Sequence, residues 1–236
     1  MKKAILVVSF GTSHLDALNN SIKKIEDSIQ ENFKEYDVFR SFTSHMIVRK
    51  LKEKHNIEVL FPEDALKKLG EEGYEEVIVQ PLHIIPGEEF DYIKHMVKEY
   101  EPCFKKIEIG RPIFHYEGFE SGPDDYSYFV DTMKDLIEKN SPCVFVGHGS
   151  AHPSNAVYGC LQSVLIDKDY EDVFVGTVEG YPNFSNVLKK AKKKDIKEIT
   201  IIPLMVVAGD HAKNDMASDE EDSWKSRFES EGIKAN

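Results

Sequence analysis

The chain has 236 residues, of which 41% are hydrophobic and 11% aromatic, enough for one large α/β domain or two smaller ones. Its formal net charge of -12 argues against nucleic acid as a partner, because phosphate binding needs a basic surface. Cys103, Cys143 and Cys160 are too scattered for a disulfide framework or a paired-cysteine zinc site, and no apolar run reaches the length of a membrane span. We therefore expect a cytoplasmic globular protein.

Short strand-like runs alternate with helical patterns in the first half of the chain. Apolar residues recur every three or four positions from Leu15 to Phe33, which predicts one long helix. The same analysis predicts strands at 4–9, 36–42 and 77–85, and helices at 44–54, 62–70 and 88–100. The segment 116–125, rich in Gly, Pro and acidic residues, predicts a linker between two α/β domains, which we place at 1–120 and 121–236.

The second half repeats this alternation. We expect strands at 143–146, 173–178 and 199–207, and helices at 126–138, 155–165, 184–193 and 218–229. Segment 5–13 is similar to 144–150, and 78–89 is similar to 200–211, so that Pro81 aligns with Pro203, Phe10 with His148, and Glu89 with His211. These matches favour a duplicated α/β unit, although βα units also resemble one another through patterning alone.

Three strands of the second half each lead to a residue that can bind a metal ion. His148 lies between two glycines after the first strand, Glu179 follows the second, and His211 follows the third. Parallel strands end at one edge of a sheet, and α/β proteins bind ligands there. Structural explanations exist for two of these residues: His148 as a loop histidine bound to a backbone carbonyl, and Glu179 as a cap of the helix near Pro182. The recurrence nevertheless favours a small, open metal site with nitrogen and oxygen ligands in the second domain.

Other candidate residues have weaker signals. His83 lies inside an apolar run, where a hydrogen-bonded rim histidine and a ligand-contacting histidine fit equally well. A basic patch around Arg40 and Arg49 is either a solvated surface or a docking surface for a polycarboxylate. The Walker loop and the GxGxxG, GxSxG and HExxH motifs are absent from the sequence, which argues against nucleotide-driven and esterase chemistry.

Segments spread over nearly the whole chain resemble the anaerobic sirohydrochlorin cobaltochelatases. These CbiK-type class II chelatases are ATP-independent and are related in fold to protohaem ferrochelatase. The similar segments are 3–13, 39–44, 49–51, 82–85, 147–149, 178–182, 203–219 and 222–225. The resemblance implies two similar Rossmann-like or flavodoxin-like domains whose parallel sheets face each other across a cleft. Family members usually continue with a further strand and a helix that packs on the first domain, which this chain is expected to lack.

The resemblance also implies roles for individual residues. The family's metal ligands fall on His148, Glu179 and His211, and its proposed proton acceptor falls on His148, with Glu179 beside it in catalysis. We expect the tetrapyrrole to contact these residues of the first domain: Ser9, Phe10, Thr12, Arg40, Ser44, Arg49, His83 and Glu89.

The expected reaction is insertion of Co²⁺ into sirohydrochlorin or precorrin-2, without a nucleotide. Two neutral imidazoles and a carboxylate suit Co²⁺, Ni²⁺ or Fe²⁺, and a histidine can accept a pyrrole proton near neutral pH. The alternatives are the same insertion with Fe²⁺ or Ni²⁺, and a tetrapyrrole- or metal-binding protein without turnover. A homo-oligomer is compatible with the sequence, whereas no nucleic-acid or membrane partner is expected.

Overall fold

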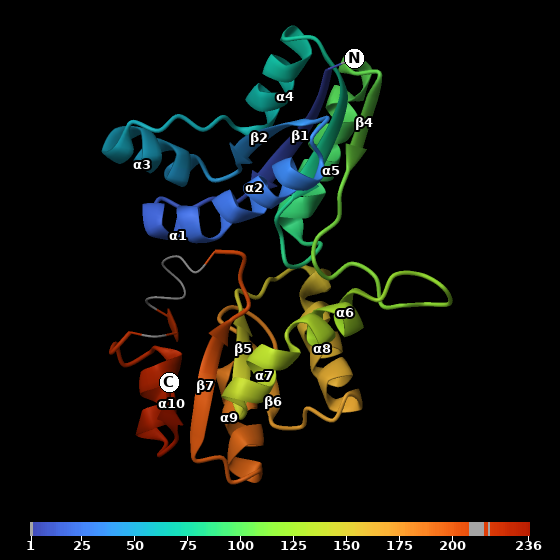
Figure 1. Ribbon diagram of the computed structural model, residues 1–236. Coiled ribbons are helices and arrows are strands. Elements are labelled where there is room, and N and C mark those ends of the chain that lie inside the picture. The colour runs from blue at the N-terminus through green and yellow to red at the C-terminus, as the bar shows by residue number, and fades with distance from the viewer. Residues whose placement is uncertain (1, 208–214, 217) are drawn as a thin grey trace. The chain divides into compact units, whose positions relative to one another are not determined.

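The computed structural model describes residues 2–207, 215–216 and 218–236, and divides the chain into two compact units, Met1–Ile113 and Phe114–Asn236. Each unit is a four-stranded parallel sheet with helices packed on it (Figure 1). The three cysteines are free. Within the described part of the chain, no helix is long and apolar enough to cross a membrane.

The first unit is built around a buried central strand, whose run of Ala, Ile, Leu and Val fits a parallel strand covered on both faces. The sheet order is β2-β1-β3-β4, with strands β1 (Lys2–Ser9), β2 (Asp37–Phe42), β3 (Tyr74–Pro81) and β4 (Lys106–Ile109). The helices are α1 (Leu15–Asn20), α2 (Ile22–Asn32), α3 (His45–His55), α4 (Pro62–Glu71) and α5 (Glu88–Tyr100), followed by the 3₁₀ turn η1 (Glu101–Cys103).

The second unit has the sheet order β6-β5-β7-β8, with strands β5 (Cys143–Gly147), β6 (Val173–Thr177), β7 (Glu198–Pro203) and β8 (Lys234–Ala235). Its helices are α6 (Asp125–Thr132), α7 (Lys134–Asn140), α8 (Ala156–Asp167), α9 (Phe184–Lys193) and α10 (Trp224–Ser230), and the 3₁₀ turn η2 (Pro153–Asn155) precedes α8.

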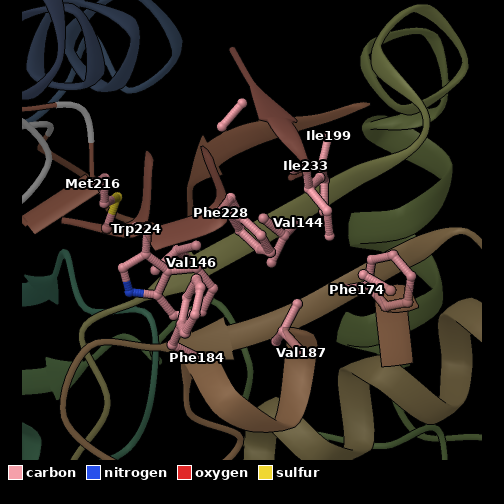
Figure 2. Packing of buried hydrophobic residues seen from close by; sticks show 12 residues of the cluster. Val144, Val146, Phe174, Phe184, Val187, Ile199, Met216, Trp224, Phe228 and Ile233 are labelled. Atoms are coloured by element: carbon pink, nitrogen blue, oxygen red, sulfur yellow. The ribbon is translucent and has the colours of Figure 1, made fainter. Parts of the chain in front are cut away.

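Aromatic side chains close one face of the second sheet (Figure 2). The ring of Phe184 on α9 packs edge-on against Trp224 on α10, with ring centroids 5.2 Å apart, and Phe228 completes the group. Gly176 on β6 makes room for this packing, because a Cβ there would lie 2.4 Å from the Trp224 ring. The core therefore fixes α9 and α10 against the strands that lead to the candidate site.

The two sheets have the same strand order, in which the first strand of each unit lies at the centre. Pro81 pairs with Val8 in the first sheet, and Pro203 pairs with Val146 in the second, so the predicted alignment of the two prolines is confirmed. The hydrogen bonds one residue after each proline also correspond in the two sheets. Leu82 N–H donates to the Val8 carbonyl at 2.7 Å, and Leu204 N–H donates to the Val146 carbonyl at 2.8 Å.

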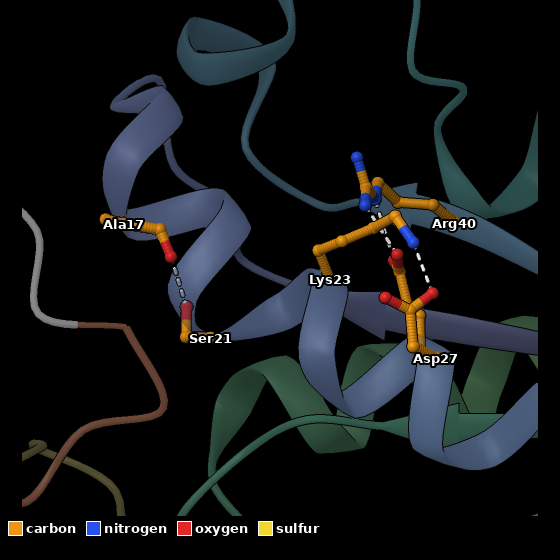
Figure 3. Close-up of polar contacts among 6 residues, drawn as sticks. Ala17, Ser21, Lys23, Asp27 and Arg40 are labelled. Atoms are coloured by element: carbon orange, nitrogen blue, oxygen red, sulfur yellow. Dashed lines mark hydrogen bonds and ion pairs between the residues drawn. The ribbon is translucent and has the colours of Figure 1, made fainter.

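Some predicted elements are wrong in length. The helix expected from 15 to 33 is divided into α1 and α2, because Ser21 leaves the helical conformation (φ -126°, ψ -84°). The Ser21 hydroxyl donates to the Ala17 carbonyl at 2.6 Å, the local bond by which serine competes with helix continuation (Figure 3). The helix expected at 126–138 is similarly divided at Met133.

Two strands end earlier than predicted, and two others are missing from the prediction. The strands expected to reach residues 85 and 207 end at Pro81 and Pro203, and a single further ladder bond, from Leu82 or Leu204, follows each of them. The short edge strands β4 and β8 have no counterpart in the prediction. The last helix begins at Trp224 rather than at 218, since Ser223 is its N-cap and accepts a hydrogen bond from Ser226 N–H at 3.1 Å.

Candidate metal site at the strand ends of the second unit

His148 and Glu179 follow neighbouring strands that end side by side. Gly147, the last residue of β5, pairs with Thr177, the last residue of β6. The hydrogen bonds continue past both strands: Val178 N–H donates to the Gly147 carbonyl at 3.0 Å, and Glu179 N–H donates to the His148 carbonyl at 2.7 Å. The structure thus brings these two predicted ligands together on directly bonded backbone, with both side chains exposed.

Glycines on both sides of His148 allow this close approach. A Cβ at Gly147 would lie 2.3 Å from the Tyr158 ring. Gly149 has φ +86°, which disfavours other residues, and a Cβ there would lie 2.0 Å from the Glu179 carbonyl oxygen. The pattern of a histidine between two glycines therefore reflects packing constraints that place His148 against the Glu179 loop.

The His148 ring is oriented by its own loop. Its Nδ1 lies 3.0 Å from the Gly149 carbonyl oxygen. A carbonyl only accepts hydrogen bonds, so in the neutral ring Nδ1 carries the proton and Nε2 carries the lone pair. The lone pair of Nε2 is the part of the ring that binds a metal ion or takes up a proton. The bond to the Gly149 carbonyl is compatible with a purely structural histidine. It also fixes the tautomer in which Nε2 can bind a metal ion.

His211, the third predicted ligand, lies outside the described residues. The segment that leads to it leaves β7 beside β5, as the bond from Leu204 N–H to the Val146 carbonyl shows. No group of three or more His, Cys, Asp or Glu side chains is placed to hold a metal ion among the residues that the structure describes. The structure therefore describes the positions of His148 and Glu179 at the strand ends, whereas the position of His211 remains a prediction.

The first unit has the same scaffold with other side chains. Thr43 N–H donates to the Ser9 carbonyl at 2.9 Å, the counterpart of the bond from Val178 to Gly147, so Ser44 occupies the position of Glu179. Phe10 occupies the position of His148 and is 52% exposed. Gly11 has φ +92°, close to the φ +86° of Gly149.

Thr12 and Ser44, two further polar candidates at this edge of the first sheet, accept hydrogen bonds from backbone N–H groups nearby in the chain. The Thr12 hydroxyl oxygen accepts a hydrogen bond from His14 N–H at 3.2 Å, and Ser44 caps α3 by accepting from Ile47 N–H at 3.4 Å. The first unit thus presents an aromatic ring and hydroxyl groups where the second unit presents an imidazole and a carboxylate.

Several buried polar atoms at this end of the first sheet have no hydrogen-bond partner among the described residues. They are Ser9 Oγ, Thr43 Oγ1, Glu89 Oε2 and both ring nitrogens of His83. Burial lowers the pKa of His83 to about 4, so its ring is neutral at physiological pH. Buried polar groups are normally hydrogen-bonded, so these atoms are exceptions within the described part of the first unit. Thr43 lies within the family-like segment 39–44 but is not among the predicted site residues.

The two arginines of the expected basic patch differ in their surroundings. Arg40 on β2 donates from Nε to Oε1 of Glu26 on α2 at 2.7 Å and from Nη2 to the other carboxylate oxygen. Figure 3 shows the Arg40 side chain beside α2. An external carboxylate would therefore have to compete with Glu26. Arg49 on α3 is 73% exposed, and its Nε lies 4.0 Å from Glu53 Oε1. The structure does not bring Arg40 and Arg49 to a common partner.

Comparison with known proteins identifies relatives over the whole chain. Residues 3–236 match the family model described as cobalt chelatase (CbiK). The chain is 38% identical over 238 residues to a sirohydrochlorin cobaltochelatase of Salmonella typhimurium, covering all of this chain and 88% of that protein. It is 30% identical over 240 residues to the sirohydrochlorin cobaltochelatase CbiKC of Nitratidesulfovibrio vulgaris, covering 99% of this chain and 82% of that protein.

Solved structures show the same fold. SirB from Bacillus subtilis with Fe³⁺ is similar with a TM-score of 0.67 and 17% identity, over 100% of this chain and 88% of that one. The sirohydrochlorin chelatase SirB from Bacillus subtilis subspecies spizizenii in complex with cobalt is similar with a TM-score of 0.63 and 16% identity, over 100% of this chain and 86% of that one. At these identities the likeness concerns the fold, and the predicted α/β architecture with two parallel sheets is confirmed.

Proposed function

Because the chain belongs to the cobalt chelatase (CbiK) family, we propose that it is a sirohydrochlorin cobaltochelatase that inserts Co²⁺ into sirohydrochlorin or precorrin-2. The observation that carries the proposal is the placement of His148 and Glu179 on bonded backbone at adjacent strand ends, in a chain with full-length cobaltochelatase relatives. We propose that the reaction needs no nucleotide, and that the free cysteines reflect a cytoplasmic location.

In this proposal Co²⁺ is a substrate held by His148, Glu179 and His211. An imidazole nitrogen and a carboxylate oxygen are ligands that divalent first-row metals accept, and three protein ligands leave positions open for the pyrrole nitrogens. The affinity order of these metals does not select Co²⁺ over Ni²⁺, so Fe²⁺ and Ni²⁺ are competing substrates in the test below.

His148 also takes a pyrrole proton in this proposal. Insertion of a divalent ion releases two N–H protons from the macrocycle; one passes to the neutral His148 imidazole and the other to solvent water. The bond between Nδ1 and the Gly149 carbonyl makes Nε2 the basic nitrogen of the neutral ring. The same atom cannot bind the ion and carry a proton together, so the ion must leave His148 as the proton arrives.

The first unit would then hold the macrocycle. Sirohydrochlorin carries eight carboxylates, and we propose that Ser9, Thr12, Ser44, His83 and Glu89, at the strand ends and helix starts of this unit, lie along its binding surface. The exposed Phe10 ring offers a flat apolar surface to a planar ligand. Of the two arginines, Arg49 has the more accessible guanidinium for a substrate carboxylate.

A metal-resolved assay tests the proposal. The absorbance of sirohydrochlorin is followed anaerobically with Co²⁺, Fe²⁺ or Ni²⁺, with catalytic amounts of protein and no nucleotide. We expect turnover with Co²⁺ that exceeds the spontaneous rate and is lost in His148→Ala. His55→Ala, which removes an exposed histidine at the end of α3, is the control that should keep wild-type turnover.

The possible outcomes separate the alternatives. Faster turnover with Fe²⁺ or Ni²⁺ than with Co²⁺ would retain the chelatase and change its metal. A spectral change that stops at one equivalent of protein would indicate a binding protein and overturn the proposed enzyme.

A further inference from the structure

The side chain of Asn155 joins the loop of His148 to the loop of Glu179. Its Oδ1 accepts a hydrogen bond at 3.0 Å from the N–H of Ser150, two residues after His148. Its Nδ2 donates a hydrogen bond at 2.7 Å to the carbonyl of Tyr181, two residues after Glu179. One amide thus binds the backbone on both sides of the candidate metal site.

Asn155 is held in place for this role by its own segment. Ser150 Oγ accepts from His152 N–H at 3.0 Å, and His152 Nδ1 accepts from Ser154 N–H at 3.1 Å, so the chain turns back toward Ser150. Asparagine at a helix N-cap usually bonds to the first turn of its own helix. Asn155 is the N-cap of α8, yet its side chain makes no such cap bond. Its polar atoms are used by the two loops instead.

The backbone directly after Glu179 lies close to the side-chain amide of Asn155. Gly180 has φ +152°, and a Cβ at this position would lie 2.7 Å from Asn155 Oδ1. Glycine directly after Glu179 therefore lets the loop backbone lie against the Asn155 side chain. On the other side of the same contact, Gly149 lies against the Glu179 carbonyl, so the two loops are packed together by glycines and bridged by one asparagine.

We propose that Asn155 is a positioning residue, which fixes the spacing of His148 and Glu179 without touching the ion. The inference rests on the proposed function, since it assumes that these two side chains bind Co²⁺. Both side chains are exposed, so their backbone is the part that the fold can hold in place. Residues that orient metal ligands in this way typically change metal affinity 10- to 100-fold when they are replaced.

Two substitutions test the role of the amide. Asn155→Ala removes both hydrogen bonds, and we expect Co²⁺ affinity, measured by competition with a chelator in the absence of tetrapyrrole, to fall about 10-fold. Asn155→Asp keeps an acceptor for Ser150 but turns a second acceptor toward the Tyr181 carbonyl, and should also weaken binding. The control is Asn140→Ala, which removes one bond of 2.7 Å to the Leu136 carbonyl at the end of α7 and should leave Co²⁺ affinity unchanged.

A double-mutant cycle separates positioning from a general loss of stability. If Asn155 acts through Glu179, then Asn155→Ala should weaken Co²⁺ binding much less in a Glu179→Gln background than in the wild type. A merely structural effect would add equally in both backgrounds. The visible absorption of bound Co²⁺, which reports ligand geometry, should change in Asn155→Ala and remain unchanged in Asn140→Ala.

The failure of this inference is distinguishable from the failure of the proposed function. Wild-type Co²⁺ affinity in Asn155→Ala, together with weakened binding in His148→Ala, would overturn the role of Asn155 and leave the metal site standing. Unchanged binding in both His148→Ala and Glu179→Gln would overturn the metal site and Asn155 with it. If Asn155→Ala does not fold, the nearly isosteric Asn155→Asp decides the question.

Discussion

Arg40 on β2 binds Glu26 on α2 through two hydrogen bonds, so that a forked ion pair joins the strand to the helix. The side chains of Arg40 and Glu26 are only 22% and 10% exposed to solvent. Arg40→Ala would leave the Glu26 carboxylate buried without its cation. We expect the free energy of unfolding, measured with urea, to fall by roughly 2–4 kcal/mol.

Arg49→Ala is the matched control for that experiment, because Arg49 is largely exposed. Its removal should change the free energy of unfolding by no more than about 0.5 kcal/mol. If Arg49 binds a substrate carboxylate, the same variant should raise KM for sirohydrochlorin about 2- to 5-fold, and added salt should mimic it. Equal stability of Arg40→Ala and the wild type would contradict a structural role for the ion pair.

The two histidines of the proposed metal site should give different phenotypes. His148→Ala removes a ligand and the proton acceptor together, so turnover should be lost even at saturating Co²⁺. His211→Ala should mainly weaken metal binding, and high Co²⁺ should restore part of its turnover. Steady-state kinetics over a range of Co²⁺ concentrations distinguish the two, and near-normal turnover in His148→Ala would refute its role as proton acceptor.

The glycine between His148 and Ser150 should not tolerate a side chain. Gly149→Ala would place a methyl group 2.0 Å from the Glu179 carbonyl at a positive φ, and we expect a loss of at least roughly 2 kcal/mol of stability together with weakened Co²⁺ binding. Gly159→Ala is the control, since among the described residues no atom outside its own stretch of helix lies within 4 Å of a Cβ at that position. It should stabilise the protein by about 0.5–1 kcal/mol. A Gly149→Ala protein with wild-type stability would show that the two loops are not packed as described.

His83 should make stability depend on pH. Burial lowers its pKa from 6.5 to about 4, so between these values the unfolded chain binds a proton that the folded chain does not. This penalty is nearly absent above pH 6.5 and grows as pH falls toward 4, reaching about 2 kcal/mol at pH 5. Urea unfolding at pH 7 and pH 5 measures it. His83→Gln should lose less stability than the wild type over this range, whereas equal losses would contradict the assignment.

The elements that the sequence predicts best are those with strong periodicity and clear ends. The helices α5 and α9 have the predicted bounds, because acidic residues or an asparagine cap mark their starts and their apolar spacing is regular. The strands β4 and β8 escaped prediction because they are short edge strands. In β4, Lys106 and Glu108 alternate with two half-buried isoleucines, a pattern that four residues cannot distinguish from a loop.

The sequence predicts those residues of the candidate metal site that directly follow a strand. His148 and Glu179 follow strands that are neighbours in a parallel sheet, and topology alone brings such residues together. Asn155 and Thr43 could not be found in this way. The role of Asn155 depends on a turn that folds back on Ser150, and the isolation of the Thr43 hydroxyl depends on burial that only the folded chain creates.

The bond between the Glu179 N–H and the His148 carbonyl bears on how quickly an ion can be exchanged. If His148 and Glu179 bind the ion as proposed, their ordered backbone means that only side-chain rotamer freedom is lost when the ion arrives, and little of the protein has to rearrange. Exposed side chains also let water replace a ligand one bond at a time. In the proposed site, capture and release of Co²⁺ without backbone rearrangement would suit a protein that hands its ion over in every cycle rather than storing it.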